Sequence, residues 1–178
     1  IVRQAIGGDS LTELEQLAGA TLAQSDLVIV TGGASVGEHD FAKPMFDAHG
    51  LDLMFSKVAI KPGKPVWLGR AQGKWVLGLP GNPTSAMVTA RLFLLPLLAA
   101  LQGQPARDVL RWRSLPLAAP LPANGTRETY VRAVWEDDGL APISNQDSGA
   151  QAALAKADWL IRRPPNSPAQ AKGAMVNA

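Results

Sequence analysis

One short apolar run constrains the fold of this chain more than any other stretch. Residues 26–31, "DLVIVT", are apolar almost without interruption, and Gly32 and Gly33 follow directly. A strand exposed on one face alternates apolar and polar side chains, whereas a strand of a parallel sheet is buried on both faces and is apolar throughout. The run therefore predicts a strand of an open α/β sheet, with a glycine-rich turn at its carboxyl end.

The neighbouring segments continue an α/β pattern. Residues 10–24 carry leucines at helical spacing, and Ser10 with Glu13 forms a capping box at the start of that helix. Further along the chain we expect a helix over 39–49, a strand over 51–60, a hairpin from "PVWLGR" and "KWVLGL", and a helix that begins at Asn82-Pro83. Pro96 should kink or end that last helix, because proline lacks the amide N–H.

The character of the sequence changes after residue 104. Residues 106–178 are rich in proline and contain several short alternating runs, "VLRWRSLPL", "TYVRAVW" and "ADWLIRR". Such runs, separated by turn residues, predict a small all-β unit. We therefore expect an α/β domain over 1–104 and a small all-β domain over 105–178. Trp112, Trp135 and Trp159 are expected in the core of the second domain.

Composition excludes several classes of function. The chain has no cysteine, so disulfides, thiolate catalysis and cysteine-based zinc sites are excluded, and two histidines do not favour a histidine-rich metal site. A net charge of +2 without a Lys/Arg run argues against a nucleic-acid partner. The apolar run 86–101 is shorter than the roughly 20 residues that span a membrane. We expect a soluble, cytoplasmic protein that does not act at a membrane.

Two stiff loops point to an anionic ligand. "KVAIKPGKPVW", residues 57–67, holds Lys57, Lys61 and Lys64 around Pro62 and a second proline. Because prolines fix the backbone, these lysines would lose little entropy on binding an anion. The same loop is equally compatible with a solvated turn between strands.

The second stiff loop is "GLPGNPTSAM", residues 78–87. Pro80 and Gly81 predict a tight turn, after which Asn82-Pro83 opens a helix with exposed amides and Ser85 adds a hydroxyl in its first turn. A helix start of this kind can hold an anion. A well-capped helix would need the same residues, so the pairing with the lysine loop is what favours the anion site.

The glycine-rich stretch "VTGGASVGEHD", residues 30–40, is less specific. Glu38-His39 stand where a phosphate-binding loop needs Lys and Ser/Thr, and the glycines do not have the dinucleotide spacing. An anion site at the strand end and a simple tight turn both remain open. Asp40 and Asp9 each lie at an expected helix start, where capping competes with a role in Mg²⁺ binding or catalysis.

Together, "TGGASVGEHDF", "AIKPGKPVWLG" and "GLPGNPTSAMVT" resemble the signature strings of one family, the molybdopterin molybdenumtransferases, which comprise bacterial MoeA and the matching domain of gephyrin. The resemblance implies a three-layer α/β/α molybdopterin-binding domain, like that of the MoaB/Mog proteins and incomplete at its N-terminus. It implies that residues 105–178 form the family's C-terminal β-barrel-like domain. It also implies Mg²⁺-dependent insertion of molybdate into adenylyl-molybdopterin, with release of AMP, by a protein that is a homodimer at full length.

The resemblance also assigns roles to residues. Asp9 and Asp40 match acidic active-site positions, and Asp40 would bind Mg²⁺. Arg132 and Ser148 match an arginine and a serine that approach molybdate, although spacing alone predicts surface residues at both positions and at Arg127. The remaining substrate-binding positions would be Gly32, Gly33, Ser35, Lys57, Lys61, Pro62, Lys64, Pro80, Gly81, Asn82, Pro83 and Ser85.

Two other functions share parts of this pattern. A stand-alone molybdopterin adenylyltransferase has the α/β domain but typically ends with it, and a non-catalytic scaffold or receptor-anchoring module can use both domains. The chain also departs from the family: it starts without Met, the first strand of the α/β domain is missing, and "QDSGAQ" lacks the glycine expected before Ser148. We therefore expect a fragment that carries much of the anion pocket and is inactive by itself.

Overall fold

The structure, a computed structural model, describes residues 3–32, 41–147, 149 and 151–178. The chain divides into two compact units. The first comprises Ile1–Val58 with Gly63–Asn82, and the second comprises Ala59–Pro62 with Pro83–Ala178. This division differs from the expected boundary at residue 104, because the long helix after Asn82 and the short segment 59–62 group with the C-terminal strands.

The first unit is a four-stranded sheet in the order β1-β5-β4-β2. Its strands are β1 (Leu27–Thr31), β2 (Asp52–Ser56), β4 (Trp67–Ala71) and β5 (Lys74–Leu79). As the apolar run predicted, β1 pairs in parallel with β5, while β4 is antiparallel to both β5 and β2. The expectation that β1 is buried on both faces was wrong: Val28 is buried, but its neighbour Ile29, on the other face, is 43% exposed. The expected mixed α/β architecture is thus present.

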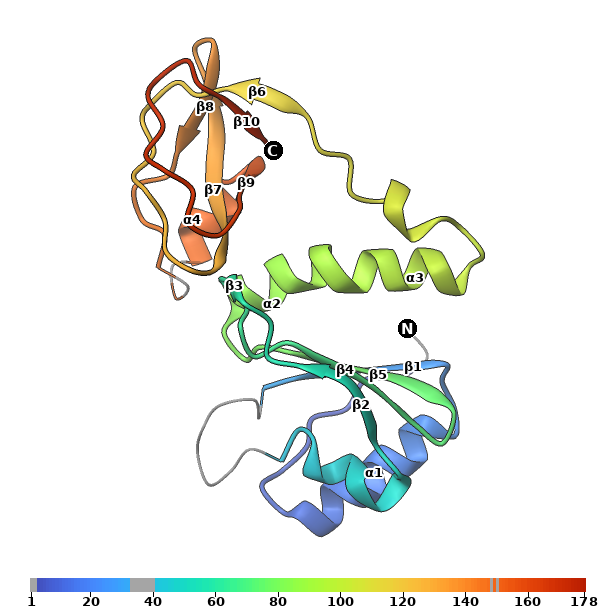
Figure 1. Ribbon diagram of the computed structural model, residues 1–178. Helices are drawn as coiled ribbons and strands as arrows, with labels where there is room; N and C mark the ends of the chain where they lie inside the picture. The colour runs from blue at the N-terminus through green and yellow to red at the C-terminus, as the bar shows by residue number, and fades with distance from the viewer. Residues whose placement is uncertain (1–2, 33–40, 148, 150) are drawn as a thin grey trace. The chain divides into compact units, whose positions relative to one another are not determined.

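Helix α1 (Leu11–Leu22) and the 3₁₀ helix η1 (Pro44–His49) lie on the same face of this sheet (Figure 1). Their apolar side chains close a core over β1, β4 and β5 in which Leu22, Phe46 and Trp67 are essentially inaccessible to water. The Ser10 side chain accepts a hydrogen bond from the Glu13 amide, as the capping box predicted. Of the helix expected over 39–49, only residues 44–49 are helical in the described part, and they form a 3₁₀ rather than an α-helix.

The predicted hairpin between β4 and β5 is confirmed. It turns at Gln72 and Gly73, which have φ values of 49° and 77°. A turn with two successive residues in the left-handed backbone conformation matches the twist of the flanking strands. Because that conformation has a positive φ, such turns favour glycine. The strand expected over 51–60 is interrupted instead: β2 ends at Ser56, and β3 (Ile60–Lys61) pairs with a strand of the second unit.

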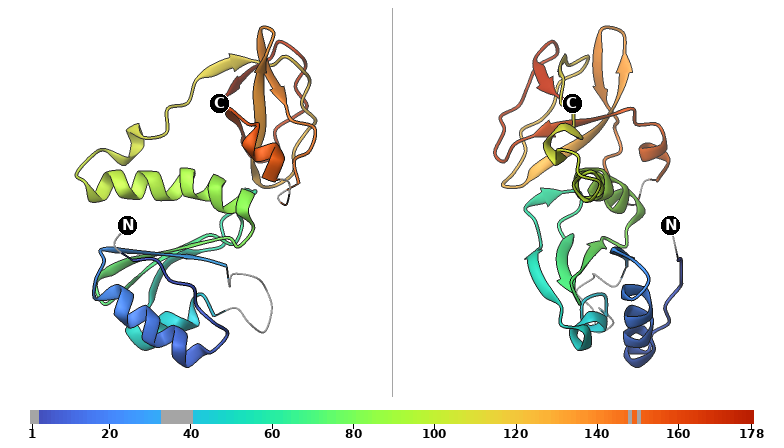
Figure 2. Two further views of the ribbon diagram at one scale, coloured as in Figure 1. Left: turned by 180° about the vertical axis from the view of Figure 1, so that it is seen from behind. Right: turned by 90° about the vertical axis from the view of Figure 1, so that its right-hand side faces the viewer.

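The second unit contains a six-stranded sheet in the order β3-β7-β9-β10-β6, with β8 paired to β7. These strands are β6 (Ser114–Pro116), β7 (Glu128–Glu136), β8 (Gly139–Pro142), β9 (Trp159–Arg163) and β10 (Met175–Asn177), and Figure 2 shows β7 and β9 side by side. Their core includes Leu117, Leu140 and Ile161. Trp159 packs against this core, but Trp135 is 48% exposed, so the expectation that it is a core residue was wrong. The sheet is open rather than a closed barrel.

The helices of the second unit are α2 (Pro83–Thr89), η2 (Ala90–Leu94), α3 (Leu95–Leu101), η3 (Ala106–Asp108) and α4 (Gln151–Ala155). Pro96 does not end the long helix. The preceding segment η2 is a π-helix, after which the Leu95 amide donates to the Ala90 carbonyl, and the helix continues through Pro96 in the first turn of α3. By length and a mean hydropathy of 1.7, residues Pro83–Leu101 could cross a membrane, a test that core helices of soluble proteins also pass.

Tight packing of Gly78 against Trp67 generates a first prediction. A Cβ at position 78 would lie 1.9 Å from the Trp67 indole nitrogen, and the ring cannot move because it is fully buried. Gly78→Ala should therefore lower the free energy of unfolding by about 1–3 kcal/mol or more, as overpacked cores do. The matched control is Gly8→Ala in the same unit, where a Cβ meets only an ordinary contact at 3.6 Å. Equal urea-unfolding midpoints for the two variants would contradict this packing.

The single tyrosine gives a second prediction. Burial, and then the negative charge of Glu128, raise the pKa of Tyr130 from 10.0 to about 12. Tyrosinate absorbance should therefore titrate near pH 12 in the folded chain and near pH 10 in urea. Because the unfolded state loses this proton first, stability should fall as pH rises from 10 through 12. A folded-state midpoint near 10 would show that Tyr130 is hydrated.

Candidate functional site

The register of the four-stranded sheet brings several predicted site residues to one edge. Thr31 pairs with Leu79, so β1 and β5 end side by side. Trp67 pairs with Gly78 on one side and with Ser56 on the other, so β4 begins and β2 ends at this same edge. We call this edge of the sheet the carboxyl edge. It is defined by the predicted site residues of the first unit that lie in the loops next to these strand ends: Gly32, Lys57, Lys64, Pro80, Gly81 and Asn82. Loops at the carboxyl ends of parallel strands are the usual ligand sites of open α/β sheets.

At the centre of the carboxyl edge the backbones of two loops nearly touch. A Cβ built on Gly81 would lie 3.1 Å from the Gly32 Cα, closer than such contacts normally allow. Gly32 itself has a φ of 88°, a conformation that favours glycine, and among the described residues no atom beyond its chain neighbours lies within 4 Å of the position that its Cβ would take. Glycine at these two positions therefore lets the backbones that follow β1 and β5 lie close together where the strands end.

The lysine loop is fastened by its own backbone. The Lys57 amide donates to the Val66 carbonyl at 3.2 Å, and the Val58 amide donates to the Lys64 carbonyl at 3.0 Å. Lys57 holds a left-handed φ of 65°. Both lysine side chains are exposed, so a fixed backbone presents two mobile ammonium groups to solvent. Lys61 and Pro62 belong to the second unit, where Lys61 pairs with Thr129 of β7 and is also exposed.

The residues that follow Asn82, at the start of the next helix, are buried. Pro83 begins α2, and Thr84 and Ser85 in its first turn are 0% and 6% exposed. The Thr84 hydroxyl has no hydrogen-bond partner within the described part of the chain. Ser85 accepts a bond through its carbonyl from the Thr89 hydroxyl at 2.7 Å. The predicted role of Ser85 in holding an oxyanion stays a prediction.

Four predicted site residues lie outside the described residues: Gly33, Ser35, Asp40 and Ser148. Asp9 is described and exposed, directly before the cap of α1. Over residues 3–32, 41–147, 149 and 151–178, no group of three or more His, Asp or Glu side chains could hold a metal ion. The described residues therefore do not form a Mg²⁺ site by themselves.

Arg132 is buried, in contrast to the surface position that spacing predicted. It is 2% exposed on β7, and its guanidinium donates to the carbonyls of Asn145 at 3.3 Å and Asp147 at 3.0 Å. Gln146 completes this network by accepting from the Arg132 amide and donating to the Arg132 carbonyl. Burial lowers the pKa of Arg132, and the charge of Asp147 opposes that shift.

The hydrogen bonds of Arg132 show what this buried side chain does in the second unit. It ties β7 to the loop that leads into Ser148, so its described contacts are structural. Sequence analysis missed Gln146, the side chain that joins the loop to the strand, because a contact across 14 positions leaves no periodic signal.

A sizeable cavity of the described residues lies elsewhere. It has a volume of about 740 Å³ within the second unit, and its lining is mostly apolar, with Met87, Leu95, Trp112 and Trp159 among the residues. None of the predicted site residues lines it. The predicted residues of the carboxyl edge therefore lie outside this cavity.

Comparisons with known proteins identify the family of this chain. The family model described as the probable molybdopterin binding domain matches residues 1–100, and that of the MoeA C-terminal region (domain IV) matches residues 114–178. Molybdopterin molybdenumtransferase from Haemophilus influenzae is 49% identical over 54% of this chain and 24% of its own length. Molybdopterin molybdenumtransferase 2 from Mycobacterium tuberculosis is 32% identical over 81% of this chain and 36% of its own length.

A solved structure supports the same conclusion. The molybdopterin biosynthesis MoeA protein from Pyrococcus horikoshii superposes with a TM-score of 0.76 at 27% identity, covering 95% of this chain and 40% of that one. The chain thus spans well under half the length of these relatives. With both family models matched in order and the open α/β sheet and β unit in place, the chain belongs to the MoeA family of molybdopterin molybdenumtransferases.

Proposed function

We propose that this chain forms the oxyanion-binding part of a molybdopterin molybdenumtransferase, which inserts molybdate into adenylyl-molybdopterin and releases AMP. The observation that carries the proposal is the carboxyl edge, where the closely packed backbones at Gly32 and Gly81 lie on the same edge as Lys57 and Lys64. We expect their amide groups to bind the anion together with the lysines. The match of residues 114–178 to the MoeA C-terminal region favours this activity over that of a stand-alone adenylyltransferase.

The chemistry of the edge suits the substrates. Molybdate and the phosphates of adenylyl-molybdopterin are tetrahedral oxyanions, which amide N–H groups and ammonium groups bind without any proton transfer. Charge that develops on a phosphate oxygen when AMP leaves would be stabilised by the same donors. Lysines on a loop whose backbone is already held by hydrogen bonds suit anion binding, because only their side chains lose conformational entropy when the anion binds.

Further parts of the proposal come from the family resemblance. They are the dependence on Mg²⁺, with Asp40 as its ligand, a role for Asp9 in catalysis, a homodimer at full length, and a cytoplasmic location. When bound, Mg²⁺ would neutralise phosphate charge and polarise the bond to AMP. The described residues do not form a metal site, so no step is assigned to the metal here.

Lysine substitutions test the proposal. Lys57→Met and Lys64→Met keep the aliphatic stem and remove the charge. Each should weaken molybdate binding about tenfold in calorimetry, because a hydrogen bond to a charged group contributes about 1.5 kcal/mol or more.

The matched control is Lys74→Met, which changes the same charge on the same sheet. Lys74 starts β5 at the opposite edge and pairs with Asp26 at 3.2 Å. Binding within about twofold of the unaltered chain is expected for this variant, because exposed ion pairs contribute little. Equal losses in all three variants would indicate nonspecific attraction and would contradict a site at the carboxyl edge.

Arg132 generates a separate prediction about positioning. Arg132→Met leaves the carbonyls of Asn145 and Asp147 without their donor, so the free energy of unfolding should fall by about 2–4 kcal/mol, since each buried group left unpaired costs about 1–3 kcal/mol. Amide hydrogen exchange in 143–147 should accelerate. The control Arg127→Met alters an exposed arginine on the same domain and should change stability by less than about 0.5 kcal/mol. If Arg132→Met instead left stability unchanged and abolished molybdate binding, Arg132 would be a direct ligand.

A further inference from the structure

The second unit carries a groove whose walls are mostly apolar. It is the cavity of about 740 Å³ between the long helix Pro83–Leu101 and the segments that lead into β6 and β9. On the helix, Met87, Arg91 and Leu95 line the groove at four-residue spacing. Met87 and Leu95 are 63% and 39% exposed, so apolar surface remains in contact with water. The groove therefore suits a partner that brings apolar surface of its own.

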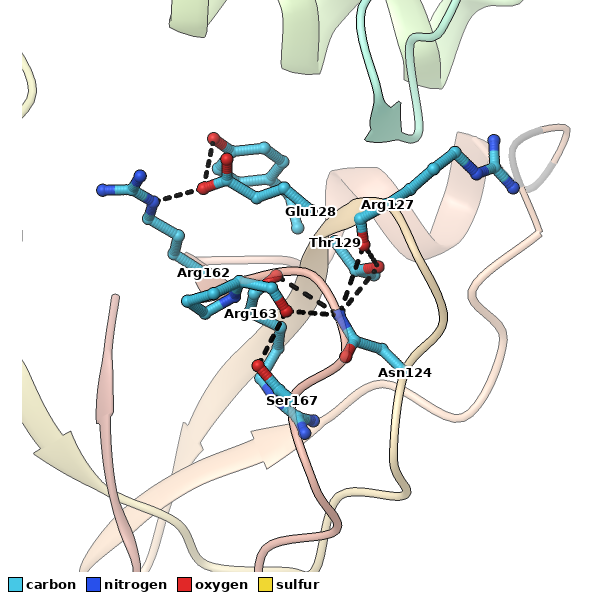
Figure 3. A network of polar contacts seen from close by, with 9 residues as sticks. Asn124, Arg127, Glu128, Thr129, Arg162, Arg163 and Ser167 are labelled. Atoms are coloured by element: carbon cyan, nitrogen blue, oxygen red, sulfur yellow. Dashed lines mark hydrogen bonds and ion pairs between the residues drawn. The ribbon is translucent and has the colours of Figure 1, made fainter.

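The second wall of the groove is already ordered. Trp112 lies in it, with the Arg162 guanidinium 5.5 Å from the centre of its ring and the Tyr130 ring 6.2 Å away. Glu128 holds both neighbours: as Figure 3 shows, Arg162 forms an ion pair with this carboxylate. The Tyr130 hydroxyl donates to the same carboxylate at 3.2 Å. The wall therefore exists before a partner arrives, and little entropy is lost there on binding.

The charges along the groove are mostly positive. Arg91, Arg111 and Arg113 line it and are exposed, and no described residue forms an ion pair with any of them. The acidic groups of the described lining are Asp158 and the carboxylate of Ala178. Three positive groups thus stand against two negative ones. An apolar group surrounded by negative charge would complement this groove.

The same unit presents such a group at the end of the hairpin formed by β7 and β8. Glu136 of β7 pairs with Gly139 of β8, so Asp137 and Asp138 make the turn. Trp135, directly before them, is 48% exposed. The three carboxylates are exposed and form no ion pair within the described part of the chain. We call residues 135–138 the hairpin tip.

One chain does not fill its own groove with this tip. Within the part of the chain that the structure describes, no residue of the hairpin tip lines the groove. A second copy can supply it, because every chain carries both surfaces and two copies related by a twofold axis can exchange their tips. A net charge of +2 opposes such an association only weakly.

We infer that the hairpin tip of one chain binds in the groove of a second copy, with the Trp135 ring between the apolar walls and the tip carboxylates near the arginines of the lining. A tryptophan that fills a pocket is a typical anchor of protein interfaces, and the charges around it orient the partners. The groove has a volume within the range of about 300–1,000 Å³ that holds whole small molecules, so the indole ring and the turn enter together. The contact uses no residue of the carboxyl edge and is independent of the proposed oxyanion site.

Charge reversal tests this contact on the intact 178-residue chain. Sedimentation velocity at low salt follows the dimer, whose dissociation constant should be on the order of 10 µM for two small contacts. The tip variant carries Glu136→Lys, Asp137→Lys and Asp138→Lys. The groove variant carries Arg91→Glu, Arg111→Glu and Arg113→Glu.

Each variant alone should dimerise at least about tenfold more weakly than the unaltered chain, because like charges then meet in both contacts. Mixed in equal amounts, the two variants should form a heterodimer, because each tip then meets a groove of opposite charge. All six positions are exposed, so the substitutions leave the core of the unit unchanged.

Two controls separate this contact from nonspecific attraction. Trp135→Ser, added to both variants, should abolish the heterodimer, because opposite net charges without the anchor do not fill the groove. Lys172→Glu reverses an exposed charge outside both surfaces and should leave dimerisation of the otherwise unaltered chain within about twofold.

Three outcomes would overturn the proposal. The first is an unaltered chain that stays monomeric at about 200 µM, well above the expected dissociation constant; the groove would then serve a different partner. The second is a dimer that the tip and groove variants form as readily as the unaltered chain. The third is a heterodimer that survives Trp135→Ser.

Discussion

The parallel pairing of β1 with β5 is the constraint on which the candidate site depends. Because Thr31 lies opposite Leu79, the loops that follow both strands emerge at one edge, and the antiparallel strands β4 and β2 add the two ends of the lysine loop to it. With strands spaced about 4.8 Å apart, the four strand ends extend over roughly 14 Å. A one-residue slip would move the core side chains of β1 to the other face and separate Gly32 from Gly81.

Buried arginines organise the second unit in a different way. Arg132 and Arg163 lie on β7 and β9 with 2% and 3% exposure, and each donates to carbonyl groups of a loop rather than to a carboxylate. A carbonyl accepts the hydrogen bond but does not neutralise the charge, so these residues position loops at a cost in desolvation. For Arg132 the positioned loop leads to Ser148, and for Arg163 the acceptors are Pro122 and Pro168, which lie in two separate loops.

Local patterns in the sequence predicted the elements that local physics determines. The uninterrupted apolar run gave the parallel strand β1, the capping box gave the start of α1, and the turn residues between β4 and β5 gave the hairpin. The glycine pair Gly32 and Gly81 could be named but not placed together, since only the strand register sets their distance. Gly33, Ser35, Asp40 and Ser148 lie outside the described residues, so their predicted roles remain predictions.

Local sequence patterns could not predict the burial that long-range contacts determine. Trp135 looked like a core residue by type but lies 48% exposed near the end of β7, and Arg132 looked like a surface residue by type but is buried by partners 13 to 15 positions away. Pro96 was expected to kink or end the long helix, yet the helix continues through it after a π-helical segment. In each case tertiary packing overrode a preference that residue type alone had set.

Crystals soaked in molybdate would test the central claim most directly, because the anomalous signal of molybdenum locates the anion without reference to any variant. We predict an anomalous peak at the carboxyl edge, within hydrogen-bond distance of main-chain amides at Gly32 or Gly81 and near the ammonium groups of Lys57 and Lys64. A peak elsewhere on the chain, with the carboxyl edge empty at a molybdate concentration that saturates binding in solution, would contradict the account.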